Sequence, residues 1–186
     1  MIMLMRLLVL SVSIVVAGQL MAAYQPVNLE EKPPKFELST SAFLDEGVLP
    51  VLYTCDGKDL SPQIAWTNPP PKTKSFALIM SDPLAPKGTF YHWVLFNMSA
   101  KTTEIAEGMQ PLATGSVLGQ NDFGKTQYNG PCPPKGSAHT YIFTVYALDS
   151  NLSLKKGATA KDVLAAMQKH MLGQSKLTAV YSRWIQ

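Results

Sequence analysis

Short apolar runs separated by turn residues make up most of the chain beyond its first 35 positions. Strand patterns lie at 36–39, 64–67, 75–80, 91–98, 141–148 and 177–181. The run at 75–80 is apolar from its second residue on, as in a central strand covered on both faces, whereas 141–148 alternates aromatic and smaller residues. Another apolar, β-branched run, 48–55, ends at the turn signal Asp56-Gly57. We therefore predict a mostly β fold.

One segment near the C-terminus has helical periodicity instead. Thr159 is the predicted N-cap, and Asp162 in the first turn suits the positive end of the helix dipole. The apolar positions that recur at helical spacing are Val163, Leu164, Met167 and Met171. Gly173 is the predicted stop, which places His170 in the last turn in a structural role.

The first 23 residues have the pattern of a signal peptide. Arg6 supplies a positive charge ahead of the apolar run Leu7–Ala17, and Ala22 and Ala23 suit a cleavage site. The alternative is an uncleaved membrane anchor, although the apolar run is short for a helix that spans a bilayer. We expect export, to the periplasm or to the outside of the cell, with residues 1–23 removed.

The rest of the chain fits one domain. Residues 24–35, rich in proline and charge, predict a flexible lead-in, and residues 36–186 predict a single β-rich domain. An apolar fraction of 46% is that of a globular protein. The net charge is only +3 and no basic run is present, so nucleic acid is not an expected partner.

Two polar residues interrupt the apolar strand patterns. Asp82 ends one run and is followed by Pro83 and Pro86, which would hold its carboxylate at a strand end, and His92 opens the next run. Together they suit a binding site. Taken singly, each is also typical of a turn acid or of a core histidine with satisfied hydrogen bonds.

Segment 128–141 joins a loop dense in glycine and proline to the start of a strand. His139 and Tyr141 are two residues apart and so share one face of that strand. An imidazole, a phenol hydroxyl and backbone N–H groups of the stiff loop could cradle phosphate or carboxylate. Rigid turn chemistry without any ligand is the alternative.

The chain has two cysteines, Cys55 and Cys132. In an exported protein they favour a disulfide, which would staple the glycine- and proline-rich loop to a distant part of the chain. Two free thiols are the alternative.

Several motifs, in the same order along 36–181, resemble the phosphatidylethanolamine-binding (Raf kinase inhibitor-like) family, in its bacterial YbhB/YbcL-like branch. They are Tyr53-Thr54-Cys55-Asp56-Gly57, Ser61-Pro62, Trp66, Asp82-Pro83, Ala85-Pro86, His92-Trp93, Asn121-Asp122-Phe123-Gly124, Pro133-Pro134-Lys135-Gly136, and His139 with Tyr141. The sequence departs from the family pattern at Leu84, where many relatives have a second acid, and at Thr140, where many have arginine.

The resemblance implies a sandwich of antiparallel sheets with a small pocket for phosphate-like head groups. The pocket positions map onto Asp82, Pro86, His92, Tyr128, Gly130, His139 and Tyr141. The implied ligand is a small anion such as phosphate, phosphoethanolamine or an acetate-like group, and a homodimer is consistent with the resemblance. The alternative function is that of a protein inhibitor or regulator, of a kinase or peptidase, whose pocket recognises a phosphorylated or carboxylate group of a protein partner.

A carboxylate in an anion pocket needs an explanation, because Asp82 would repel phosphate. It could accept from a protonated histidine, be protonated itself, or face an ammonium group of the ligand. We expect His92 and His139 to donate to the anion, so that binding weakens as pH rises through the histidine range.

Catalysis is not expected. The sequence has no Gly-x-Ser-x-Gly elbow, and Cys132 lies between prolines instead of at a helix N-terminus. A metal site made from Asp82, His92 and His139 has no supporting His-Glu-x-x-His pattern. We predict a non-enzymatic protein that uses neither a cofactor nor a metal.

Overall fold

The computed structural model describes residues 34–108 and 115–183. The predicted signal peptide, its anchor alternative and nearly all of the predicted lead-in lie outside these ranges. Within them, no helix combines the length and the apolar character needed to cross a membrane.

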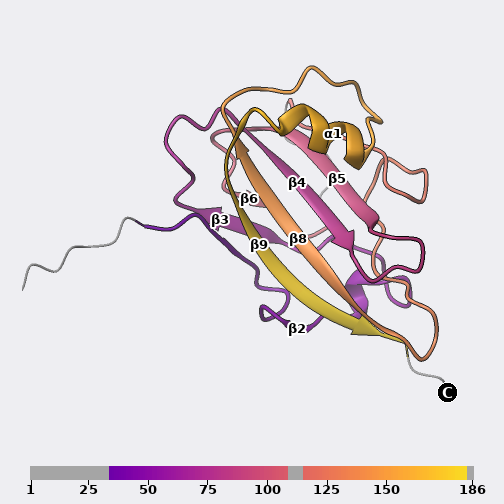
Figure 1. Ribbon diagram of the computed structural model, residues 1–186. Coiled ribbons are helices and arrows are strands. Elements are labelled where there is room, and N and C mark those ends of the chain that lie inside the picture. The colour runs from indigo at the N-terminus through magenta and orange to yellow at the C-terminus, as the bar shows by residue number, and fades with distance from the viewer. Residues whose placement is uncertain (1–33, 109–114, 184–186) are drawn as a thin grey trace, which may run out of the picture. The chain divides into compact units, whose positions relative to one another are not determined.

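Two β-sheets and one α-helix make up the fold (Figure 1). The larger sheet has the order β2 (Gly47–Val48), β9 (Met171–Ser182), β8 (Ala138–Leu148), β4 (Ser75–Asp82), β5 (Phe90–Ser99), β7 (Val117–Leu118). The smaller sheet has the order β1 (Glu37–Ser39), β3 (Ile64–Thr67), β6 (Glu104–Ile105). The predicted mostly β class is confirmed. Neighbouring strands are antiparallel except for β2, which runs parallel to β9.

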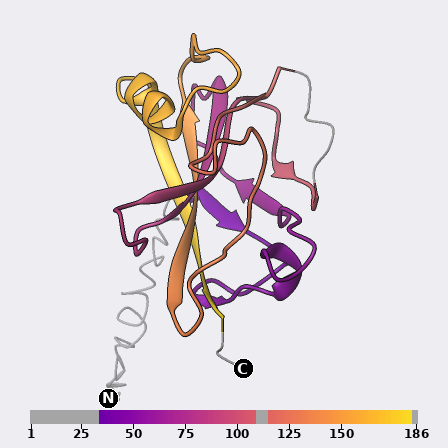
Figure 2. The ribbon, with the colours of Figure 1, turned by 90° about the vertical axis from the view of Figure 1, so that its right-hand side faces the viewer.

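The main hydrophobic core lies between the two sheets. Phe76, Leu78 and Met80 of β4 pack there with Trp66 of the smaller sheet. The other face of β4 carries Ala77 and Ile79, which pack on the side of helix α1 (Ala160–Met167). Figures 1 and 2 show α1 lying against the larger sheet. Because β4 is covered on both sides, its sequence is apolar at consecutive positions, as predicted.

Helix α1 begins where the sequence predicts but ends earlier. Thr159 and Asp162 form a reciprocal capping box. The helix stops at Met167, and Met171 and Gly173 belong to β9, where they pair with the end of β8. The prediction that the helix includes Met171 and stops at Gly173 is wrong, because strand pairing outweighs local helical spacing. His170 follows the helix, and its Nδ1 lies 2.8 Å from Oδ1 of Asp149.

The apolar run 48–55 does not form one strand. Strand β2 ends at Val48, and Pro50 precedes a turn of 3₁₀ helix, η1 (Val51–Tyr53). Pro50 lacks an N–H group and cannot continue a strand ladder on that side.

The strand order of the larger sheet places the end of β4 beside the beginnings of β5 and β8. Strand β4 is paired with both β5 and β8 and is antiparallel to each. The last residue of β4, Asp82, therefore lies beside the first residues of β5 and of β8. His92 and His139 come from these two strand starts, which places both histidines at the same end of the sheet as Asp82.

Candidate functional site

A cavity of about 220 Å³ opens at this end of the larger sheet. Five of the predicted pocket residues line it: Asp82, Pro86, His92, His139 and Tyr141. Their positions follow from the pleat of the sheet. His139 and Tyr141 occupy the face of β8 that continues, through Phe143, into the core between the sheets.

Asp82 and His139 form a buried pair at the cavity. Nδ1 of His139 lies 2.6 Å from Oδ2 of Asp82, while Oδ1 of Asp82 accepts from the backbone N–H of Leu84 at 2.8 Å. An ionised carboxylate only accepts hydrogen bonds, so Nδ1 of His139 carries the proton. Both Asp82 oxygens are thus bonded within the protein, and Asp82 fixes the imidazole plane of His139.

The imidazole of His92 is also fixed by a hydrogen bond through Nδ1, in this case to the protein backbone. Its Nδ1 lies 2.9 Å from the backbone oxygen of Asn129, which can only accept, so Nδ1 again carries the proton. Burial lowers the pKa of the imidazole, although the Asn129 carbonyl and the charge of Asp82 act in the opposite direction. His92 is therefore neutral at neutral pH, with its remaining lone pair on Nε2.

Tyr141 contributes a hydroxyl group that keeps its proton. Burial raises the pKa of the phenol, and the nearby Asp82 charge raises it further. The ring of Tyr141 also meets the ring of His92 edge-on at 5.3 Å between centroids, which limits how His92 can tilt.

Tyr128 and Gly130, the other two predicted pocket residues, do not line the cavity. The Tyr128 hydroxyl donates to the backbone oxygen of Tyr53 at 2.6 Å. The Gly130 N–H donates to Oδ1 of Asp59, also at 2.6 Å. The Gly130 N–H is therefore occupied within the protein. Through these hydrogen bonds, both residues fix the position of the loop that continues into the cavity wall at Cys132.

Sequence reasoning did not include the aromatic edge of the cavity. Phe90 and Phe123 line it, and their rings meet edge-on at 4.9 Å. Phe123 lies in the turn that follows Asn121, whose side chain accepts from the Phe123 N–H and donates to the backbone oxygen of His92. The motif Asn121-Asp122-Phe123-Gly124 was noted in the sequence, but nothing local assigned it to the pocket. The wall itself is Cys132-Pro133-Pro134.

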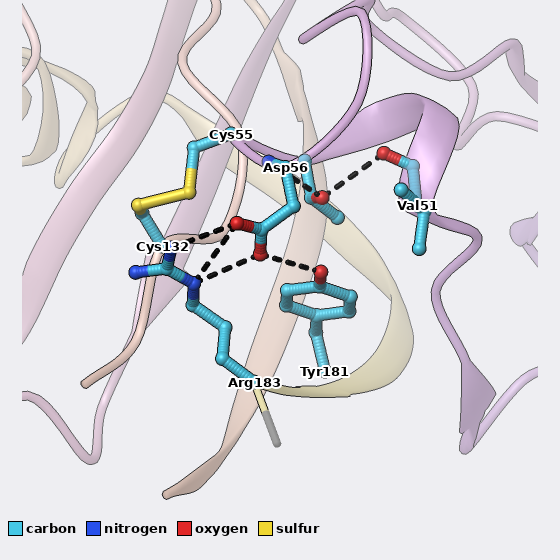
Figure 3. Close-up of polar contacts among 7 residues, drawn as sticks. Val51, Cys55, Asp56, Cys132, Tyr181 and Arg183 are labelled. Atoms are coloured by element: carbon cyan, nitrogen blue, oxygen red, sulfur yellow. Dashed lines mark hydrogen bonds and ion pairs between the residues drawn. A yellow bond between two sulfur atoms is a disulfide. The ribbon is translucent and has the colours of Figure 1, made fainter. Parts of the chain in front are cut away.

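The wall is tied to the segment after η1. Cys55 and Cys132 are joined in a disulfide, as predicted. Figure 3 shows the Asp56 carboxylate beside it, between the Arg183 guanidinium and the Tyr181 hydroxyl. The hydrogen bonds from Arg183, and then that from Tyr181, hold the pKa of Asp56 below its ordinary value. The backbone oxygen of Arg183 accepts from the backbone N–H of Gly136 at 2.6 Å, which anchors the far end of the wall loop.

Within the described ranges, no three His, Cys, Asp or Glu side chains come close enough together to hold an ion.

Comparison with known proteins agrees with this architecture. The profile of the family described as "Phosphatidylethanolamine-binding protein" matches residues 39–182. A UPF0098 protein of Methanothermobacter thermautotrophicus is 47% identical over 149 residues, covering 78% of this chain and 98% of that protein. The UPF0098 protein YbhB of Escherichia coli is 39% identical over 133 residues, covering 68% of this chain and 84% of YbhB.

Two crystal structures have the same fold. Escherichia coli YbcL, described as a member of the mammalian PEBP family, matches with a TM-score of 0.76 and 29% identity, over 82% of this chain and all of YbcL. A PEBP homolog of Chlamydia trachomatis matches with a TM-score of 0.74 and 34% identity, over 80% of this chain and 97% of that protein. The chain belongs to the phosphatidylethanolamine-binding protein family, in its UPF0098/YbhB/YbcL-like bacterial and archaeal branch.

Proposed function

We propose that this protein binds a small oxyanion, of the phosphate head-group type, without transforming it. The observation that carries the proposal is the pair of imidazoles at the cavity. His92 and His139 are each fixed through Nδ1 by a partner inside the protein, so that Nε2 is the nitrogen left for a ligand. A few fixed polar groups in an otherwise apolar cavity are typical of a small-ligand site.

The position of Asp82 removes the conflict with an anionic ligand. Its two oxygens are occupied by Leu84 and His139, so the carboxylate acts on the ligand through the imidazole. An imidazolium at His139 beside the Asp82 carboxylate would make the pair neutral overall, with Nε2 as a hydrogen-bond donor. This arrangement supports the first of the three expected ones, in which Asp82 accepts from a protonated histidine.

The cavity lining also supports binding without catalysis. Of the side chains that line it in the described part of the chain, none is a serine, a threonine, a lysine or a free thiol. The one hydroxyl, that of Tyr141, has a raised pKa and is a poor nucleophile at neutral pH.

We also propose that the protein works outside the cytoplasm. The Cys55–Cys132 disulfide supports this, because such bonds persist in oxidising compartments. Cell fractionation that finds only the full-length chain, in the cytoplasm, would contradict export.

Calorimetric titration with O-phosphoethanolamine and with inorganic phosphate, at about pH 6.5, tests the binding function. We expect saturable binding by the wild type and a loss of at least about tenfold in affinity for His139→Ala. His170→Ala is the matched control, because His170 also pairs with a carboxylate, at 2.8 Å from Asp149, but does not line the cavity. Its affinity should equal that of the wild type. Absence of saturable binding by the wild type would contradict the proposal.

A further inference from the structure

We propose that Asn151 is an acceptor for N-linked glycosylation, and that the fold keeps this residue, but not Asn97, available for it. The proposal goes beyond anion binding. It draws on the proposed export, because oligosaccharyltransferases act on the outer side of the membrane. Acceptors of this kind have the sequence Asn-x-Ser/Thr, with any residue except proline in the middle. The chain contains this pattern twice, as Asn97-Met98-Ser99 and as Asn151-Leu152-Ser153.

Asn151 lies in the connection between β8 and α1, shortly after the end of β8 (Figure 1). Asn151 and Ser153 are exposed, while Leu152 between them is only 5% exposed. The backbone of Leu152 is fixed in this position by Asn97. Its N–H donates to Oδ1 of Asn97, and its oxygen accepts from Nδ2 of the same side chain. Because Leu152 is anchored inward, the two side chains that an oligosaccharyltransferase recognises both remain exposed to solvent.

The side-chain amide of Asn151 is not engaged elsewhere in the described part of the chain. The hydrogen bond found at Asn151 uses its backbone oxygen, which accepts from the Ser150 hydroxyl at 2.8 Å. Two positions before Asn151, Asp149 supplies the acid that oligosaccharyltransferases of the bacterial type require in addition. One of its oxygens faces His170, and the Asp149 side chain is still 45% exposed. The sequence Asp149 to Ser153 is therefore a complete acceptor sequence on the surface.

Asn97 satisfies the same sequence rule but is locked by the fold. It belongs to β5, and Met98 beside it is buried. Nδ2 of Asn97, the atom that would receive the sugar, donates to the Leu152 oxygen at 3.0 Å, and Oδ1 accepts from the Leu152 N–H at 2.8 Å. A glycan is bulky and belongs on a solvated surface. Its attachment to Asn97 would break both hydrogen bonds and force the strand open.

The reaction is a group transfer without any change of oxidation state. Nδ2 of Asn151 displaces polyprenyl diphosphate from C1 of the first sugar of a lipid-linked oligosaccharide. A C–N bond forms, the C–O bond to the diphosphate breaks, and Nδ2 gives up one proton. The transferase and the lipid-linked donor belong to the membrane, and this chain supplies only the acceptor.

The surroundings of Asn151 have room for a glycan and are remote from the anion cavity. A cavity of about 270 Å³, lined by Asn151, Ser153 and Ala166 of α1 among others, lies beside the amide. His139 lies at the start of β8, whereas Asn151 follows its end. The strand has 11 residues, so its two ends are about 33 Å apart. We therefore expect the glycosylated protein to bind O-phosphoethanolamine with the affinity of the unmodified protein.

Transfer in vitro tests the proposal without relying on export. The purified protein is incubated with a lipid-linked oligosaccharide and an archaeal-type oligosaccharyltransferase, which requires only Asn-x-Ser/Thr, and mass spectrometry locates the products. Tryptic peptides 88–101 and 136–155, which contain the two acceptor sequences without the fold, are the reference. We expect both peptides to be modified. In the intact protein, modification of Asn97 should be at least about tenfold lower than that of Asn151, because β5 must open locally first.

Two serine variants provide matched controls. Ser153→Ala should abolish modification of the intact protein although Asn151 is still present, and Ser99→Ala should leave it unchanged. An intact protein that is not modified at Asn151, or that is modified equally at Asn97 and Asn151, would overturn the proposal. Failure of peptide 136–155 to react would overturn it too, because the segment would then be no acceptor even without the fold. None of these outcomes bears on anion binding, which is measured separately.

Discussion

Replacing both Cys55 and Cys132 with serine is expected to lower the free energy of unfolding by about 4 kcal/mol. The disulfide closes a loop across a sequence separation of 77 residues, so its removal restores much conformational freedom to the unfolded chain. Urea denaturation of the double variant and of the wild type, with and without reductant, measures the difference. The reduced wild type should behave like the double variant.

The same substitution should weaken anion binding, because Cys132 forms part of the cavity wall. The wall loop keeps its other anchors, including the Tyr128 hydroxyl bond to Tyr53 and the Gly130 bond to Asp59. We therefore expect reduced affinity in a chain that still folds. A double variant that loses less than about 1 kcal/mol would show that the bridge does not constrain the unfolded chain as described.

Gly130→Ala is the second substitution with a large expected effect. A Cβ atom at this position would lie 2.1 Å from the Tyr53 carbonyl oxygen and 2.9 Å from the Thr54 Cα, both of them backbone atoms. Neither can move without displacing the start of the segment that carries Cys55. Overpacking of this kind costs about 3 kcal/mol, and the wall loop should shift away from the cavity. Thermal or urea denaturation measures the first effect and anion titration the second.

Gly157→Asn is the control for that substitution. Gly157 has a positive φ of 84°, which asparagine tolerates better than most residues, and the nearest atom to an added Cβ is 3.9 Å away. Its stability should fall by no more than about 1 kcal/mol, and its anion affinity should not change. If Gly130→Ala lowers stability and anion affinity no more than this control does, the close packing of the wall loop against Tyr53 is not needed for either property.

The centre of the cavity could be anticipated because strand periodicity and turn chemistry point to it. The Asp82-Pro83 break ends a buried strand, and the two-residue spacing of His139 and Tyr141 places both on one face. Sheet order then brings these residues together with His92, a grouping that only the family resemblance implied. Periodicity alone predicted only a β-rich domain.

The parts that could not be anticipated depend on contacts between segments distant in sequence. Whether the N–H of Gly130 faces a ligand or Asp59, 71 positions away, is not encoded locally. The same holds for Met171, whose helical spacing is overridden by pairing of β9 with β8. Phe123 reaches the cavity through hydrogen bonds of Asn121 to the backbone of His92, which no local pattern reveals.

The two departures from the family pattern lie near the cavity without lining it. Leu84 is 55% exposed, and its backbone N–H is the group that donates to Asp82. An apolar side chain in place of an acid at this position removes a negative charge from the approach to the cavity without disturbing that hydrogen bond.

The central claim is that His92 and His139 turn Nδ1 toward the protein and Nε2 toward the ligand. The chain has three histidines, so ¹⁵N NMR of the imidazole nitrogens, assigned with His170→Ala, tests it most directly. In the free protein we expect both cavity histidines to carry a proton on Nδ1. Addition of inorganic phosphate should then shift their Nε2 signals and leave those of His170 unchanged. A cavity histidine whose Nδ1 carries no proton in the free protein, or phosphate saturation with no change at either cavity histidine, would contradict the account.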